Sequence, residues 1–437
     1  MLLDKNIISN YFYKYNRLYN QIMLKTWHII VENDVRLDKI MHDSLVLYDQ
    51  ALYYQRQSYF ESKQSGKIKT YSYNELWNIV KHDEAYTNTK LDISPKTYAI
   101  RQVSNNWFAF TKALMAYKKN PDKFHGKPKM PNYLYKRKNY NIVQFDKTRF
   151  RKINKIENSF YLPCSDYKIN VPKQIKLESI RQITIQKFYE KTRINIIFED
   201  KETKKNDFDS NSAIGIDIGV NNLCAITSND KAFSYVINGR PLKSMNQYFN
   251  KLYAETKSIL EKCNKSKTSK KVERLCRKRY NKIDNYLNNV SKKIIDLCIE
   301  HNINTIYIGH NPNWKQESKM SKQNNQNFVQ IPFNKLIDQL KHKASRYTDL
   351  NVVVVEESYT SKVDHLAFES LEHHEKYLGK RIKRGLFVSS TGKLLNADIN
   401  GSIGILRKGK AITDEQLLLL RDRGDVVSPV KLVITCK

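Results

Sequence analysis

The chain has 437 residues, enough for two or three domains with a core of ordinary size. Lys and Arg number 76 against 44 Asp and Glu, so the formal net charge is +32, more than solubility alone requires. Such an excess favours a polyphosphate partner. A low-GC genome would raise Lys, Asn, Ile and Tyr together, but it does not explain the excess of Lys over Glu.

The cysteines are scattered and form no CxxC pair, which argues against a zinc ribbon and against a disulfide framework. They stand at positions 164, 224, 263, 276, 298 and 436. We expect no zinc and a cytoplasmic protein with reduced thiols, associated with the nucleoid when it binds DNA. No signal peptide and no apolar run of spanning length is visible, so we expect no membrane partner.

The first third combines one strand with a helical region. Residues 25–31 (KTWHIIV) have strand composition. Apolar residues recur at helical spacing from Leu37 to Leu52, and Ser94-Pro95 has the pattern of a helix start. The aromatic residues that follow, such as Trp107, are interpreted as core.

Residues 118–200 change to short alternating runs, which predict a small β-barrel or sandwich. Residues 118–140, at the start of this region, carry one acid among many basic residues with Tyr interleaved, which favours nucleic-acid binding over a solvated linker. The basic residues that we single out are Lys127, Lys129, Lys136, Arg137 and Lys138. Residues 200–212 are polar and charged, and predict the main domain boundary.

Residues 213–220 (AIGIDIGV) place isoleucines on one strand face and the lone acid Asp217, flanked by glycines, on the other. Two more strands, 223–228 and 233–237, complete an antiparallel meander of the kind that opens RNase H-like folds. A sugar-kinase-type phosphate loop could begin in the same way.

A long helical stretch is expected at about 244–300. Between residues 262 and 293 it has twelve Lys or Arg and two acids. Like charges at helical spacing repel, so this stretch favours contact with a nucleic-acid backbone over a merely solvated face. Lys278 and Arg279 are our candidate contacts there.

Acids follow the last predicted strands and helix. Residues 305–309 and 351–357 are apolar strands that bracket a helix at 333–346, which predicts a parallel extension of the sheet. Glu356 and Glu357 end the second strand at the carboxyl edge, where open α/β sheets place their sites. Asp398 lies in the first turn of a last helix, 396–407.

From about residue 210 to 407 the chain resembles the RuvC domain of the TnpB (OrfB) family, transposon-encoded RNA-guided nucleases related to compact type V CRISPR effectors. The resemblance covers nearly the whole chain and is weaker in the first half. The matching stretches are GIDIGVNNL (215–223), INGRPLKSMNQYFNK (237–251), NNQNFVQIPF (324–333), EESYTSK (356–362), GKRIKRGLF (379–387), NADINGSIGIL (396–406) and, in the first half, KFHGKPKMPNY (123–133).

The resemblance implies three acids that bind two Mg²⁺ ions. Asp217 and Asp398 match the first and last of them, but the family's usual middle glutamate is absent, because the strand at 305–309 ends in Gly309-His310. Some branches of the family supply a glutamate from the next strand. Because neighbouring side chains alternate, only one of Glu356 and Glu357 can face the metals. We choose Glu357 and keep Glu356 as the fallback.

The resemblance also implies a multidomain α+β architecture. Residues 1–205 would form a wedge-like β-barrel with a helical recognition insertion at about 35–118, and would bind the guide RNA and target duplex. Residues 206–408 would form the RuvC-like nuclease domain, and 409–437 a tail.

Within the nuclease domain, a basic insertion at 363–395 replaces the family's zinc ribbon. We interpret the insertion as a cationic lid, with candidate contacts Lys380, Arg381, Lys383 and Arg384. A metal site built from its histidines, His365, His373 and His374, is the alternative.

The predicted activity is two-metal, Mg²⁺-dependent cleavage of double-stranded DNA at sites chosen by guide-RNA pairing and a short target-adjacent motif. Three alternatives remain open. They are a nuclease-dead RNA-guided regulator, a DDE-type transposase, and an RNA-binding accessory protein of a transposon without enzymatic activity.

Overall fold

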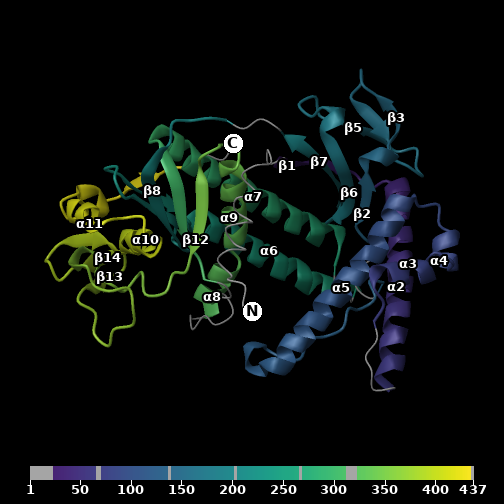
Figure 1. The fold of residues 1–437 in the computed structure, drawn as a ribbon, viewed down its shortest axis with the longest axis horizontal. Coiled ribbons are helices and arrows are strands. Elements are labelled where there is room, and N and C mark those ends of the chain that lie inside the picture. Colours follow the sequence, from purple (N-terminus) through teal and green to yellow (C-terminus); the bar gives the residue numbers. More distant parts are fainter. Residues whose placement is uncertain are drawn as a thin grey trace, which may run out of the picture. The chain divides into compact units, whose positions relative to one another are not determined.

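The protein is described by a computed structural model that covers residues 23–64, 70–135, 139–200, 204–264, 268–311 and 322–434. The chain divides into two compact units, residues 1–201 and 202–437 (Figure 1). The division lies within the polar stretch that the sequence indicates as the boundary.

The N-terminal unit contains two antiparallel sheets with a shared hydrophobic core. The four-stranded sheet has the order β1 (Met23–Val31), β7 (Lys191–Asp200), β6 (Ile180–Phe188) and β2 (Val143–Asp146). The three-stranded sheet has the order β3 (Arg151–Asn154), β4 (Ser159–Tyr161) and β5 (Lys168–Asn170). The predicted strands are present, but among the described residues the strand pairing does not close into a ring, so the barrel is not confirmed.

The helices of this unit lie mainly between β1 and β2 in the sequence. They are α2 (Val35–Gln64), α3 (Tyr73–Val80), α4 (Glu84–Thr87) and α5 (Ile93–Lys119). Helix α5 begins close to the predicted Ser94-Pro95 start, with Asp92 as its N-cap. Trp107 is almost fully buried in a core that α2, α3 and α5 share. This burial agrees with the sequence-based interpretation of Trp107 as a core residue.

The C-terminal unit is built on a six-stranded sheet with the order β12-β11-β8-β9-β10-β16, in which the edge strand β16 is Val430–Leu432. Strands β8, β9 and β10 form an antiparallel meander, while β11 and β12 continue parallel to β8. Their bounds are β8 (Asp209–Ile218), β9 (Asn222–Ser228), β10 (Ser234–Asn238), β11 (Ile303–Gly309) and β12 (Asn351–Val355).

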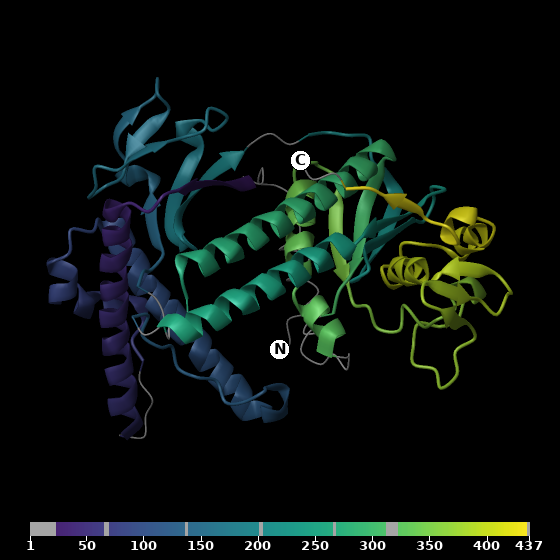
Figure 2. The same cartoon turned by 180° about the vertical axis from the view of Figure 1, so that it is seen from behind.

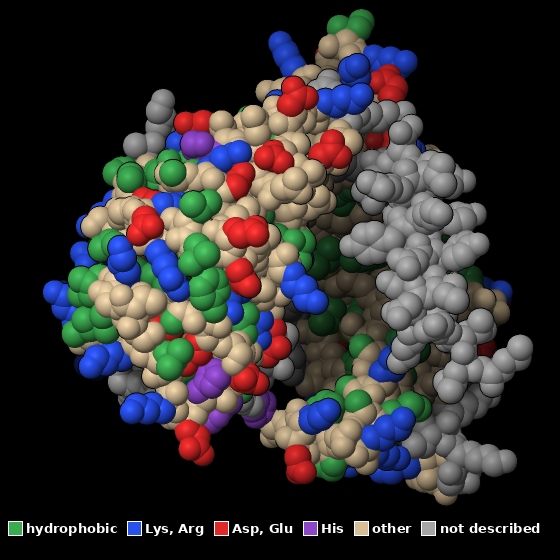
Figure 3. Space-filling model, turned by 60° about the vertical axis from the view of Figure 1, so that its left-hand side comes forward, with side chains coloured by type: hydrophobic (Ala, Val, Ile, Leu, Met, Phe, Trp, Pro, Cys, Tyr) green, Lys and Arg blue, Asp and Glu red, His purple; other side chains and the backbone are tan. Residues whose placement is uncertain are grey.

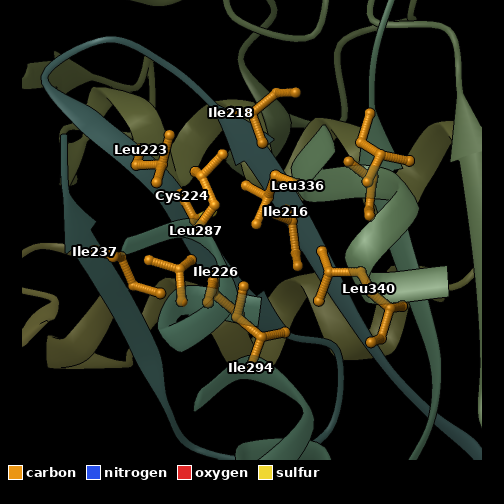
Figure 4. Packing of buried hydrophobic residues seen from close by; sticks show 14 of the residues in the cluster. Ile216, Ile218, Leu223, Cys224, Ile226, Ile237, Leu287, Ile294, Leu336 and Leu340 are labelled. Carbon is orange, nitrogen blue, oxygen red and sulfur yellow. The ribbon is translucent and has the colours of Figure 1, made fainter. Parts of the chain in front are cut away.

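Strand alternation decides what each face of this sheet touches. The isoleucines of β8 pack with β9 and with the helices α7 (Lys270–Glu300) and α9 (Phe333–Ala344) in one core, shown in Figure 4. The labelled side chains there are Ile216, Ile218, Leu223, Cys224, Ile226, Ile237, Leu287, Ile294, Leu336 and Leu340. Asp217 therefore points to the opposite face, which is covered by α10 (Ala397–Lys408). This arrangement confirms the alternation that residues 213–220 predict.

The expected helical stretch at 244–300 consists of two helices that pack against each other, α6 (Arg240–Asn264) and α7 (Lys270–Glu300) (Figures 1 and 2). Ser269 caps the second helix by accepting a hydrogen bond from the backbone N–H of Val272. Two shorter helices complete this side of the unit, α8 (Lys322–Val329) and α9 (Phe333–Ala344).

The last part of the chain differs from the predicted tail. Helix α11 (Asp414–Arg421) packs into the core with α10, and β16 (Val430–Leu432) pairs in parallel with β10 at one edge of the sheet. The segment expected as an insertion forms a small sheet of β13 (Lys380–Lys383), β14 (Leu386–Val388) and β15 (Leu394–Asn396). Apolar residues beyond position 408, namely Leu417, Leu420 and Val426, thus belong to the fold, because they pack in one core with α10.

Within the described ranges, no helix combines the length and the apolar character that crossing a membrane requires.

Candidate active site

Three predicted acids are brought to one region of the C-terminal unit. Asp217 is the second-last residue of β8, Glu357 follows the end of β12, and Asp398 lies in the first turn of α10. Burial, followed by the charges of Glu357 and Asp398, raises the pKa of Asp217 well above its ordinary value. The three carboxylates therefore interact electrostatically, although they come from distant parts of the sequence.

Glu357 and its neighbour Glu356 differ sharply in environment. Glu356 is exposed and accepts a hydrogen bond from Ser358, whereas burial raises the pKa of Glu357 to about 7. The Glu357 side chain lies next to Gly309, the last residue of β11, since a Cβ at Gly309 would be in ordinary contact with Glu357 Cγ at 3.4 Å. The structure thus places Glu357, rather than Glu356, beside Asp217.

Asp398 is held by polar neighbours from two other segments. Asn222, at the start of β9, donates from Nδ2 to Asp398 Oδ2 over 2.7 Å. The Arg381 guanidinium on β13 lies 3.4 Å from Asp398 Oδ1. Asn396 caps α10 by accepting hydrogen bonds from the backbone N–H groups of Asp398 and Ile399.

The donor set suits Mg²⁺, which prefers carboxylate oxygens. The Glu357 Oε2 atom is buried and has no hydrogen-bond partner in the part of the chain that the structure describes. A buried carboxylate oxygen without a hydrogen-bond partner, beside two like charges, is an arrangement that a divalent cation would stabilise. Even so, no three His, Cys, Asp or Glu side chains of the described residues are grouped closely enough to hold one ion. The residues fit a divalent cation chemically, but their side chains are not gathered around one point.

The predicted nucleic-acid contacts in the C-terminal unit have different surroundings. Lys278 is exposed, while Arg279 donates to Asn246 Oδ1 over 2.7 Å and so joins α7 to α6. The basic residues of the β13–β14 hairpin are exposed, namely Lys380, Arg381, Lys383 and Arg384. Figure 3 brings this end of the unit forward, and its face carries Lys and Arg interspersed with hydrophobic side chains. The role of these residues in binding stays a prediction.

In the N-terminal unit, Lys127 and Lys129 are exposed. The remaining three candidates, Lys136, Arg137 and Lys138, lie outside the described residues. The histidines of the 363–395 segment do not gather, since His365 is fully buried, whereas His373 is exposed.

Several residues that support the acids are not predicted in this role from the sequence, where His365 is considered only as a possible metal ligand. Asn311 accepts a hydrogen bond from the Glu357 backbone N–H over 2.8 Å. His365 and Arg407 contact each other beneath the loop that carries Glu357. Asn222 lies in the quoted GIDIGVNNL stretch, which was the one sequence signal available for it. The others make contacts that no local pattern indicates.

Comparisons with known proteins agree with this architecture. A family model named OrfB_IS605 and described as "Probable transposase" matches residues 195–315. The TnpB-like protein ORF457 of Acidianus two-tailed virus is 25% identical over 211 residues, which are 46% of this chain and 43% of that protein. This chain thus matches less than half of the length of that curated relative.

Two solved structures are similar to the whole chain. The Cas12f1–sgRNA–target DNA complex, determined by cryo-electron microscopy, has a TM-score of 0.50 at 15% identity, covering 92% of this chain and 86% of that one. The mini-RNA-guided endonuclease CRISPR-Cas_phi3 has a TM-score of 0.44 at 10% identity, covering 93% and 94%. The first similarity concerns the fold alone.

The fold is therefore that of a multidomain mixed α/β protein similar to a Cas12f effector. In sequence, the chain is similar to the OrfB_IS605 family model and to a TnpB-like viral protein, each over less than half of its length.

Proposed function

We propose that the chain is an RNA-guided DNA endonuclease whose cleavage centre consists of Asp217, Glu357 and Asp398. The single observation that carries the proposal is that Asp217 is buried within the electrostatic influence of Glu357 and Asp398, while Glu357 Oε2 is buried without a hydrogen-bond partner among the described residues. A protein that only binds nucleic acid gains nothing from burying like charges together, because their mutual repulsion opposes folding. The order β10-β9-β8-β11-β12, a meander extended by two parallel strands, supports an RNase H-like, RuvC-type domain.

Mg²⁺ would be held by Asp217, Glu357 and Asp398, and a pair of such ions would activate water and stabilise the leaving 3′-oxygen. The protein's own groups have separate tasks. Asn222 and the α10 N-terminus orient Asp398. The Glu357 Oε2 atom is shielded from water, which strengthens its interaction with any cation.

Nucleic acid is the partner that the charge distribution supports. Arg381 is exposed and already lies beside Asp398, so its guanidinium is available for a DNA phosphate next to the carboxylates. The exposed lysines of the hairpin and of α7 would add sequence-independent affinity. The sequence of the target would be chosen by pairing with a guide RNA, which is the division of labour in RNA-guided systems.

One observation favours a second candidate, a guide-dependent DNA-binding regulator that does not cut. Strand β11 ends in Gly309, and no three ligand side chains of the described residues converge on one point. Both candidates predict a bound RNA, and cleavage separates them.

The test is to sequence the RNA that co-purifies with the full-length protein and to assay plasmid cleavage in Mg²⁺ with a randomised flanking motif. Asp217→Ala and Glu357→Ala are expected to abolish cutting while retaining guide-dependent DNA binding. The matched control Glu356→Ala alters the exposed neighbour and should cut as the wild type does. Guide-dependent binding without cutting by the wild type would establish the regulator, and absence of bound RNA would exclude both candidates.

A further inference from the structure

His365 lies fully buried between the loop that carries Glu357 and helix α10. Its Nε2 is 2.7 Å from the backbone oxygen of Thr360, and its Nδ1 is 3.0 Å from Nη1 of Arg407. Arg407 also donates to the backbone oxygen of Glu369 over 2.8 Å, which fixes the guanidinium in place.

These partners determine the state of the ring. A guanidinium can only donate, so Nδ1 of His365 accepts from Arg407, and the proton lies on Nε2, which donates to Thr360. Burial lowers the pKa of His365 to about 4. The ring is therefore neutral, in one tautomer, and both of its nitrogens have partners.

Thr360 links this ring to Glu357. Its backbone N–H and its Oγ1 both donate to the Glu357 backbone oxygen, over 3.3 and 2.8 Å. On the other side, the Glu357 N–H donates to Asn311. Both the backbone N–H and the backbone oxygen of Glu357 are thus hydrogen-bonded. The partner of the backbone oxygen, Thr360, is itself hydrogen-bonded to His365.

Helix α10 accommodates this contact by means of a glycine. A Cβ at Gly404 would lie 2.6 Å from His365 Nε2 and 2.8 Å from Thr360 Cβ. The same helix carries Asp398 in its first turn and Arg407 in its last. The contact therefore ties the Glu357 loop to the helix that bears Asp398.

We propose that His365, oriented by Arg407, is a positioning residue that sets how Glu357 lies relative to Asp398 and thereby tunes the divalent-cation affinity of the site. This inference rests on the proposed function. Ligands must be held to within about 0.5 Å to be effective, and loss of a supporting residue costs about 10- to 100-fold in metal affinity. A histidine that only fills space would alter stability and leave the affinity unchanged.

The test measures Mn²⁺ binding by isothermal titration calorimetry to the full-length protein freed of nucleic acid, because phosphates bind the ion themselves. His365→Leu removes both hydrogen bonds and should weaken binding about 10- to 100-fold. His365→Gln keeps a donor and an acceptor and should stay within a few-fold of the wild type. His374→Leu, at a histidine of the same segment that pairs with Ser370, should leave binding unchanged.

Gly404→Ala provides a second probe in case His365→Leu does not fold. Its methyl group would displace the ring without removing it, and we expect weaker Mn²⁺ binding with circular dichroism like that of the wild type. Wild-type affinity in Gly404→Ala or in folded His365→Leu would overturn the positioning role. Asp217→Ala separates this result from failure of the proposed function. If Asp217→Ala also binds Mn²⁺ as tightly as the wild type, the cation site itself is wrong.

Discussion

Gly401 of helix α10 lies against the carboxylate of Asp217 on strand β8, so closely that a Cβ at Gly401 would be 2.7 Å from Asp217 Oδ2. Only a residue without a side chain lets the helix and the acid approach to this distance. The helix that carries Asp398 is thereby brought next to the first acid of the site.

Gly401→Ala is therefore expected to displace either Asp217 or the helix. A shift of about 1 Å at reacting groups costs about 10²-fold in rate, so we expect a loss of this order in plasmid cleavage. Gly424→Ala is the matched control, because a Cβ at Gly424 meets nothing within 4 Å. Equal cleavage by the two variants would show that the close approach does not matter for activity.

The pH dependence of stability follows from the raised pKa of Glu357. Its ordinary value is 4.5 and its folded value is about 7, so the folded protein holds a proton that the unfolded chain releases. This contribution to the free energy of unfolding is fully present below about pH 4.5 and is lost as the pH rises through 7. Asp217 acts in the same direction.

We expect the melting temperature of the wild type in a chelator to fall between pH 5.5 and 8.5 relative to that of Glu357→Gln, which cannot ionise. Mg²⁺ should restore the melting temperature of the wild type above about pH 7 and should have little effect on the melting temperature of Glu357→Gln. Differential scanning calorimetry of both proteins checks this expectation, and parallel pH curves would contradict it.

The sequence indicates the main elements of this site where local periodicity determines them. The alternation at 213–220 predicts which face of the strand Asp217 occupies. Successive side chains of a strand point to opposite faces, so Asp217 lies on the face opposite to the isoleucines. The same alternation allows only one of Glu356 and Glu357 to face the site, and in the structure Glu357 is the less exposed of the two. Both are properties of neighbours in the sequence.

Contacts between distant segments were not predictable in this way. Asn222 meets Asp398 across 176 positions, and Arg407 meets His365 across 42. The three-residue strand β16 carries too short a pattern to be recognised, and its place depends on the free edge of β10. Such contacts depend on how the elements pack, which no single segment encodes.

Arg381→Ala should reduce cleavage far more than stability. An exposed ion pair such as Arg381–Asp398 contributes about 0–1 kcal/mol, so the melting temperature should change little. A guanidinium beside the carboxylates can bind a DNA phosphate bidentately, and its loss should slow cleavage about 10- to 100-fold. Single-turnover cleavage and thermal melting measure the two effects. Lys393→Ala removes an exposed cation of the same segment that pairs with Asp422, and it should cut nearly as the wild type does; an equal loss in both variants would indicate general charge instead.

The 363–395 segment is expected to depend on a buried carboxylate. Asp364 is fully buried, and its Oδ2 accepts from Ser389 Oγ and from the N–H and Oγ of Ser390 over 2.6–2.9 Å. Asp364→Ala leaves these donors unpaired and should cost about 2–4 kcal/mol, visible as faster hydrogen exchange in residues 363–395. Asp422→Ala removes only an exposed ion pair with Lys393 of the same segment and is the control. Unchanged hydrogen exchange in Asp364→Ala would contradict the prediction. Faster hydrogen exchange of residues 363–395 in the wild type after addition of a zinc chelator would also contradict it, because the segment would then depend on a metal.

The last prediction concerns Gly309 and Glu357, because a side chain at position 309 would lie next to the Glu357 side chain. A side chain at Gly309 would point toward Glu357 Cγ and toward Ile405, whose Cδ1 would lie 2.6 Å from the new Cβ. A glutamate at position 309 could therefore replace Glu357 if the latter is removed. We expect the pair Gly309→Glu with Glu357→Ala to recover at least about 10-fold of the cleavage lost in Glu357→Ala alone, because the two changes are coupled.

Relief of crowding should increase this recovery. Ile405→Ala added to the pair removes the methyl group that Gly309→Glu would press upon, at the cost of a small cavity. His310→Glu in the Glu357→Ala background is the control, since the next residue along an extended chain faces the other way and should recover nothing. If the pair and the triple variant fold and neither exceeds Glu357→Ala in cleavage, Gly309 does not mark the place that the carboxylate must reach. Recovery in the variants that carry Gly309→Glu, but not in the one that carries His310→Glu, would mean that the site requires a carboxylate at this position. Which strand supplies it would then not matter.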